Sequence, residues 1–146
     1  MSMLSQKGRY ALRALLVLAD HAREEPMMIS EIAERAKVPR KFLEQILLDL
    51  KRRGIVRSLR GRQGGYLLGR APADITYADI IRETDGPLAL SPCVSATAYH
   101  RCADCVDEAT CAIRKVLLRA RDATAAVLES STLATAAPLR RSRRAA

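Results

Sequence analysis

Four cysteines lie close together in the second half of this 146-residue chain, in the spacing C-x8-C-x2-C-x5-C. They are Cys93, Cys102, Cys105 and Cys111. Thiolates bind iron–sulfur clusters and zinc, and they also undergo thiol–disulfide chemistry. The sequence shows no signal peptide and no apolar stretch long enough to cross a membrane, so we expect a cytoplasmic protein with no membrane partner. In that reducing compartment, clustered cysteines indicate metal binding or redox chemistry rather than structural disulfides.

A second group of chemically active side chains is basic. The chain carries a net charge of +9, and between residues 37 and 70 only Glu44 and Asp49 oppose the basic residues. Such a stripe attracts polyanions and gives salt-dependent affinity for nucleic acid, although a charge run alone could also be a solubilising face. The basic residues of this stretch are Lys37, Arg40, Lys41, Lys51, Arg52, Arg53, Arg57, Arg60, Arg62 and Arg70.

The elements that must position these basic residues are a helix and a hairpin within residues 38–69. From Phe42 to Leu50 the apolar residues recur at helical spacing, which leaves a polar face opposite them, and Gly54 is expected to end the helix. Residues 55–59 and 66–68 read as two short strands around a glycine-rich turn. A helix with many donors followed by a basic two-stranded wing suits a DNA groove and its phosphates.

The neighbouring segments complete a helix-turn-helix pattern. Residues 5–23 carry the broad apolar stripe of a first helix, and Ser30 is the expected N-cap of a second, short helix. A tight turn at Lys37 and Val38 joins that helix to the one that begins near Pro39. After the wing, Thr76 is expected to cap a further short helix, which Gly86 closes.

The predicted fold is therefore mainly α with a small β wing. We expect a winged helix-turn-helix domain (1–86), a cysteine-rich sensor loop (87–110), a long dimerisation helix (111–131) and a disordered basic tail (132–146). The long helix carries an apolar stripe that could pack against its twin in a homodimer or against the first helix of its own chain. Its members are Ile113, Val116, Leu117, Ala120, Thr124, Val127 and Leu128.

Three segments carry a family likeness: SQKGRYALRAL, ISEIAERAKVPRKFLEQIL and VRSLRGRQGGYLLGR. Together with the cysteine loop and the long helix, they resemble the Rrf-two family of winged helix-turn-helix transcriptional regulators, of the IscR, NsrR and RirA type. The resemblance covers about residues 1 to 130. It implies a homodimer that binds a partly palindromic double-stranded operator and responds to iron–sulfur or redox status.

By the same resemblance, the helix near Pro39 is the recognition helix. Gln45 could then read adenine, and Arg40 or Lys41 could reach guanine or a phosphate. Lys41 stands where some relatives carry a small hydroxyl residue, so the operator need not be theirs. Arg60 and Arg62 would enter the flanking minor groove. The complete set of DNA-contacting residues that the resemblance implies is Tyr10, Arg40, Lys41, Phe42, Glu44, Gln45, Arg60 and Arg62.

For the cysteines, the resemblance implies a [2Fe–2S] or [4Fe–4S] cluster. Known relatives use three cysteines in a tighter spacing with a fourth, non-cysteine ligand. Here Cys105 and Cys111 keep a five-residue gap, Cys93 is displaced upstream and Cys102 is additional. Arg114 replaces the histidine, and Arg9 the acidic residue, that complete the site in some relatives. Cys102, with His100 nearby, is the expected replacement.

Several functions stay open at this point. The four cysteines could hold a cluster, form a tetrahedral zinc site that includes the Cys102–Cys105 pair, or switch as metal-free thiols. The protein could also be controlled by a partner enzyme, or bind DNA without sensing anything. We do not expect an enzyme, because no acid–base set accompanies the cysteines, and His21 and His100 are the only histidines.

Overall fold

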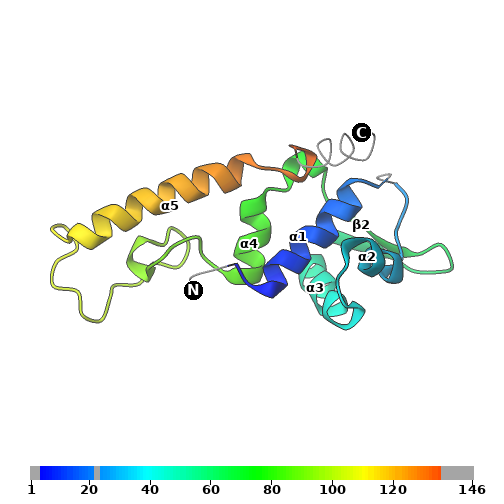
Figure 1. Ribbon diagram of the computed structural model, residues 1–146, viewed down its shortest axis with the longest axis horizontal. Coiled ribbons are helices and arrows are strands. Elements are labelled where there is room, and N and C mark those ends of the chain that lie inside the picture. The colour runs from blue at the N-terminus through cyan, green and yellow to red at the C-terminus, as the bar shows by residue number, and fades with distance from the viewer. Residues whose placement is uncertain (1–3, 22–23, 136–146) are drawn as a thin grey trace.

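The computed structural model describes residues 4–21 and 24–135 (Figure 1). It confirms a mainly α fold with a two-stranded wing. The elements are α1 (Gln6–Ala19), α2 (Ile29–Ala36), α3 (Arg40–Arg52), β1 (Val56–Leu59), β2 (Gly65–Leu68), the 3₁₀ turn η1 (Pro72–Asp74), α4 (Tyr77–Asp85), the 3₁₀ turn η2 (Pro92–Val94) and α5 (Ala112–Ser130).

The core lies where α1 packs against α2, α3 and α4. It is aliphatic, and full burial of one such side chain stabilises the fold by about 1.5–3 kcal/mol. The inner face of α3 consists of Leu43, Ile46, Leu47 and Leu50, as the periodicity predicts. Phe42 shares that periodicity but is exposed, because it lies at the edge of the face, beside the ring of Tyr10.

Two helix ends differ from the sequence prediction. α1 ends at Ala19, with Asp20 as its C-cap, rather than extending to residue 23. Ser30 is not the N-cap of α2, because the helix already begins at Ile29 and Met28 is its N-cap. The cause is the preceding residue: Met27 forms a β-bridge with Tyr66, which keeps the chain extended up to Met28.

Two turns fix how α3 sits relative to its neighbours. Lys37, between α2 and α3, adopts a left-handed conformation (φ 56°), and Pro39 is the N-cap of α3. At the other end, Arg53 is the C-cap and Gly54 follows with φ +73°, a conformation that favours glycine and stops the helix as predicted. The helix-turn-helix geometry therefore follows from local backbone preferences as well as from the core.

The wing is an antiparallel pair in which Val56 faces Leu68 and Leu59 faces Gly65. Its second strand is also bonded to the connector between α1 and α2, because the N–H and C=O groups of Met27 and Tyr66 bond to each other at 3.0 and 2.8 Å. A Cβ on Gly65 would lie 2.4 Å from the Met27 carbonyl oxygen. Glycine is therefore required there for the wing to pack on the helical body.

The second half of the chain leaves this body and returns to it. Thr76 and Asp79 form a reciprocal capping box at the start of α4, which confirms Thr76 as the cap. The chain then runs through the cysteine loop to α5, which Figure 1 shows extending away from α1–α3. Within the described residues, α5 is joined to α4 by an ion pair between Arg82 and Glu129 (2.7 Å).

The segment after α5 corrects the predicted tail. Residues 132–135 are ordered and Leu133 is fully buried in the main core. Thr132 bridges Thr76, and the Leu133 N–H donates to the Ile75 carbonyl oxygen at 3.1 Å. The basic run 140–144 lies outside the described residues.

Candidate DNA interface and cysteine site

The outer face of α3 presents the polar side chains that the sequence singled out. Arg40, Lys41, Glu44 and Gln45 are all exposed on it. The Arg40 guanidinium lies 3.4 Å from the Glu44 carboxylate, and the Lys41 ammonium lies 5.0 Å from the centroid of the Phe42 ring. The Gln45 amide nitrogen donates to Asp49 at 3.0 Å. The face therefore displays charged and amide groups of mixed donor and acceptor character.

Tyr10 reaches this face from α1. Its ring centroid is 6.2 Å from that of Phe42, and the Arg13 guanidinium lies 5.9 Å from the Tyr10 ring. The Tyr10 hydroxyl accepts a hydrogen bond from the Gln6 amide at 2.9 Å. Tyr10 and Phe42 thus form one aromatic patch that spans α1 and α3.

Arg60 and Arg62 lie in the turn between β1 and β2, and both are exposed. The turn projects away from the helical body (Figure 1). The sequence therefore placed these two arginines correctly in the turn of the wing, apart from the exposed polar face of α3.

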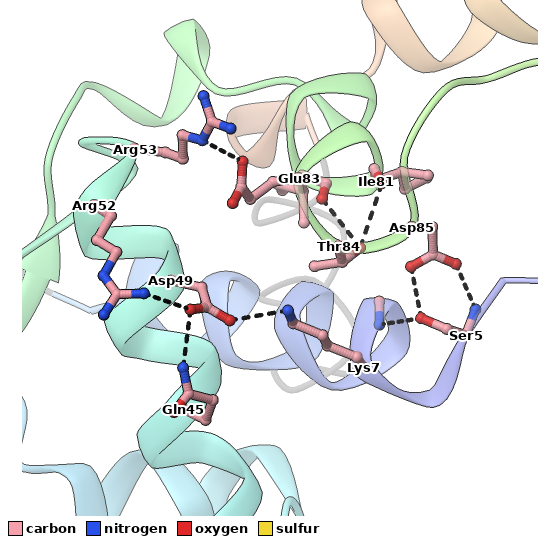
Figure 2. Close-up of polar contacts among 12 residues, drawn as sticks. Ser5, Lys7, Gln45, Asp49, Arg52, Arg53, Ile81, Glu83, Thr84 and Asp85 are labelled. Carbon is pink, nitrogen blue, oxygen red and sulfur yellow. Dashed lines mark hydrogen bonds and ion pairs between the residues drawn. The ribbon is translucent and has the colours of Figure 1, made fainter. Parts of the chain in front are cut away.

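A polar network that sequence reasoning missed joins α1, α3 and α4 (Figure 2). The Asp49 carboxylate accepts from Lys7 at 2.9 Å and from Gln45, and it lies 3.6 Å from Arg52. The hydrogen bond from Lys7 is the main cause of a lowered Asp49 pKa, and it outweighs burial. Arg53 forms an ion pair with Glu83 of α4 at 2.7 Å. No local sequence signal marks the Lys7–Asp49 and Arg53–Glu83 pairs, because their partners lie far apart in the chain.

Asp85, the last residue of α4, bonds to Ser5, the N-cap of α1 (Figure 2). The Ser5 N–H and hydroxyl each donate to the carboxylate at 2.6 Å. Burial of Asp85 favours its neutral form, but the Ser5 hydrogen bonds outweigh it and leave the pKa lowered. The end of α4 is thereby fixed to the start of α1 just before the cysteine loop begins.

All four cysteines line one cavity of about 490 Å³ beside the N-terminus of α5. Cys93 is buried and the other three are half-buried. The Ser91 hydroxyl lies 3.4 Å from the Cys93 sulfur and 3.5 Å from the Cys102 sulfur. The hydrogen bond with Ser91 is the main cause of a lowered Cys93 pKa; burial opposes it, and Cys102 and the Arg114 charge add to it.

Two arginines of α5 lie near the cysteines: Arg114 lines the cavity, and Arg121 bonds to the 3₁₀ turn that carries Cys93. The Arg114 N–H donates to the sulfur of Cys111, the N-cap of α5, at 3.4 Å. Its Nε is buried without a hydrogen-bond partner among the described residues. Arg121 donates to the Val94 carbonyl oxygen at 2.9 Å, which holds η2 against the helix. The cavity lining also includes the carboxylates of Asp104, Asp107 and Glu108, so the cysteines lie among charges of both signs.

The four thiols line one cavity, but they are not arranged as a metal-binding site. Within residues 4–21 and 24–135, no group of three His, Cys, Asp or Glu side chains is arranged to hold a metal ion. His100 and Arg9 do not line the cavity. The donor set therefore fits a cluster by its chemistry, although the described residues do not present three of the donors in a metal-binding arrangement.

A family model named Rrf2, described as an iron-dependent transcriptional regulator, matches residues 4–138. The chain belongs to the Rrf2 family. An rrf2-like HTH-type transcriptional regulator of Rhodobacter capsulatus is 48% identical over 134 residues, covering 90% of this chain and 89% of its own. Among Rrf2 structures, that of CymR, the global cysteine regulator of B. subtilis, matches with a TM-score of 0.78 at 35% identity, covering 95% of this chain and 98% of its own. T. potens IscR matches with a TM-score of 0.72 at 32% identity, covering 98% of this chain and 90% of its own.

These matches confirm the resemblance and the winged-helix fold. The protein is a DNA-binding transcriptional regulator of the Rrf2 family, and it is not an enzyme. The described helices include none that is long and apolar enough to span a membrane.

Proposed function

We propose that this Rrf2 regulator works in the cytoplasm as a homodimer whose affinity for its operator is set by the state of its four cysteines. One observation carries the proposal: cysteines scattered over residues 93–111 all line a single cavity at the start of α5. Thiols gathered in this way can respond together to metal or oxidant. A chain that only bound DNA would have no need of such a site.

The DNA-reading residues follow from the exposed faces of α3 and the wing. We assign Gln45 to an adenine, Arg40 and Lys41 to a guanine or phosphates, and Arg60 and Arg62 to the flanking minor groove. Tyr10, Phe42 and Glu44 complete the contact surface at the start of α3. The exposure of the α3 and wing side chains, and the contact of Tyr10 with Phe42 beside the start of α3, support the assignment.

The proposed dimer contact is the outer side of α5. No residue of α5 is fully buried within the chain, and Ile113, Val116 and Val127 are 72, 61 and 62% exposed. An apolar row of this kind, exposed on a long helix, is typical of a surface that another helix covers. A second copy of α5 is the proposed cover.

For the sensing chemistry, we favour an iron–sulfur cluster held by the four cysteines. Such a group would supply a charge that changes on oxidation, reduction or loss. Four thiols gathered at one cavity, which are the usual ligands of such clusters, support this assignment. Similarity to an IscR structure and the iron-dependent description of the family point the same way.

The second candidate is metal-free thiol chemistry. The Ser91 hydroxyl lies within 3.5 Å of both the Cys93 and the Cys102 sulfur, so these two thiols are neighbours that could form a disulfide. Similarity to CymR, a cysteine regulator, favours this candidate over zinc.

In either case we infer that the loop acts on α3 through α1. It begins directly after Asp85, which bonds to Ser5 at the start of α1, and Lys7 of α1 bonds to Asp49 of α3. A change in the loop can therefore alter the distance between the two α3 helices of the dimer. This distance must match two DNA half-sites about one helical turn apart.

The test is anaerobic purification followed by visible absorption and by iron, sulfide and zinc analysis. We expect a coloured protein with iron and sulfide. Colourless protein with stoichiometric zinc would refute the cluster, and colourless metal-free protein whose DNA binding responds to oxidant would establish the thiol candidate. Control by a partner enzyme is the remaining alternative, and a response of the purified protein alone to iron or oxidant would exclude it.

Cysteine variants then test the sensing role. Cys105→Ala or Cys111→Ala should leave the dimer intact but remove the dependence of operator binding on iron or oxidant. Thr97→Ala changes the same loop outside the cysteine cavity and serves as the control. Unchanged iron and oxidant dependence in both cysteine variants would refute the role of these thiols.

A further inference from the structure

Asp49 lies one helical turn after Gln45 on α3, and the two side chains bond to each other (Figure 2). The donor in this bond is the Gln45 amide nitrogen, 3.0 Å from a carboxylate oxygen of Asp49. The direction is chemically fixed, because an ionised carboxylate can only accept hydrogen bonds. As long as Asp49 is ionised, the Gln45 amide therefore cannot turn its oxygen toward Asp49.

Asp49 is itself held in place from two sides. Lys7 of α1 donates to its second oxygen at 2.9 Å, and Arg52 lies 3.6 Å from the first. The Asp49 side chain is only 19% exposed, whereas Gln45 stands in solvent on the outer face of α3. The lowered Asp49 pKa keeps the carboxylate charged at neutral pH. Gln45 is thus an exposed side chain bonded to a mostly buried one that has other partners.

The bond determines what Gln45 can offer to a base. A glutamine amide has two N–H donors and one carbonyl acceptor, and Asp49 occupies one of the donors. One donor and one acceptor remain, which is the pattern that pairs with N7 and the N6 amino group of adenine in the major groove. Guanine presents two acceptors there, N7 and O6, and would require both amide donors.

We propose that Asp49 is a specificity-determining residue. By accepting a hydrogen bond from one amide hydrogen of Gln45, it makes Gln45 bind adenine in preference to guanine. It is a positioning residue, because it acts through Gln45 rather than by touching the base. The inference rests on the proposed function in one respect, namely that Gln45 contacts a base.

The experiment uses the full-length protein and a duplex DNA library with a randomised central segment. Wild type and Gln45→Ala are selected on the same library, which identifies the base position that depends on Gln45. Four duplexes that differ only at this position are then titrated at one salt concentration, since affinities at different salt are not comparable. The titrated proteins are wild type, Asp49→Ala, Asp49→Asn and the control Glu83→Gln.

Glu83→Gln is a matched control, because Glu83 is also 19% exposed, is also ion-paired with an arginine and loses the same charge as Asp49→Asn. It lies on α4 and makes no contact with Gln45 in the network of Figure 2. Asp49→Asn keeps the shape of the side chain, and its amide can pair with Gln45 in either orientation. It therefore tests the proposal even where Asp49→Ala folds poorly.

We expect wild type and Glu83→Gln to prefer adenine over guanine at the Gln45-dependent position. In both Asp49 variants this preference should shrink on the order of tenfold, mainly through tighter binding of the guanine duplex. An unchanged ratio in both folded Asp49 variants would overturn the proposal, as would a selected sequence that is identical with and without the Gln45 side chain. A wild-type protein that selects no sequence at all would instead refute the assignment of α3 as the reading helix.

Discussion

Leu133 offers a direct test of how the C-terminal segment is attached, because its side chain is 0% exposed. Leu133→Ala removes three buried carbons, worth about 2.5 kcal/mol at ~0.8 kcal/mol each. The residual cavity adds to this, so we expect a loss of about 3 kcal/mol, within the ~2–5 kcal/mol range of leucine-to-alanine changes in cores. For a chain of this length, this corresponds to a melting temperature lower by roughly 10 °C.

The measurement is thermal and urea unfolding followed by circular dichroism, at one fixed protein concentration because a dimer melts in a concentration-dependent way. Leu48→Ala is the matched control: it makes the same change on α3, where the side chain is 39% exposed. We expect it to cost less than about 1 kcal/mol. If Leu133→Ala unfolds at the same midpoint as wild type, the segment after α5 does not contribute to the core.

Three further predictions test other parts of the molecule. Arg60→Ala should weaken operator binding and lower the slope of log affinity against log salt by about 1, measured by fluorescence anisotropy; normal affinity across salt would count against the minor-groove role. Val116→Asp should shift the protein to monomer in sedimentation equilibrium without loss of helical signal, because this side chain is exposed within one chain; a dimer that persists would contradict the assignment of α5 as the interface. The folded-state pKa of Asp85 is lowered, so its stabilisation is present above the unfolded pKa of ~3.9 and is lost as pH falls through the folded value. Asp85→Asn should therefore lose about 1–3 kcal/mol at neutral pH and show a shallower acid-side decline than wild type in urea unfolding, whereas parallel pH curves would refute this.

The elements were predictable where the signal is local. Helical spacing placed Leu43 and Leu47 on the buried face of α3, and the Thr76 N-cap followed from residue type alone. Ser30 failed as a cap because the bridge between Met27 and the distant Tyr66 had already set where α2 begins. Tertiary pairing outweighed local propensity at that point.

The candidate site shows the same division. The exposed polar face of α3 and the wing arginines could be found from charge and periodicity, and the cysteines from their spacing. The bond between Lys7 and Asp49 could not, because it depends on how α1 packs against α3. The contact between Ser91 and two thiols could not either, because it depends on how an irregular loop folds back on itself. Leu133 was assigned to a tail for the same reason: one buried leucine has no periodicity of its own.

The contacts around Thr76 have a consequence for how such a protein can be altered. The Tyr77 N–H donates to the Ser131 carbonyl oxygen at 2.9 Å, so the end of α5 returns to the start of α4. α4 itself belongs to the DNA-binding body, because Ile80 is fully buried in the core and Asp85 is bonded to Ser5. The segment that leaves the body is therefore the loop and helix after α4, and both of its ends are attached to that one helix. We expect chimaeras that keep α4 and exchange residues 87–131 to fold, whereas an exchange that includes α4 should remove part of the core.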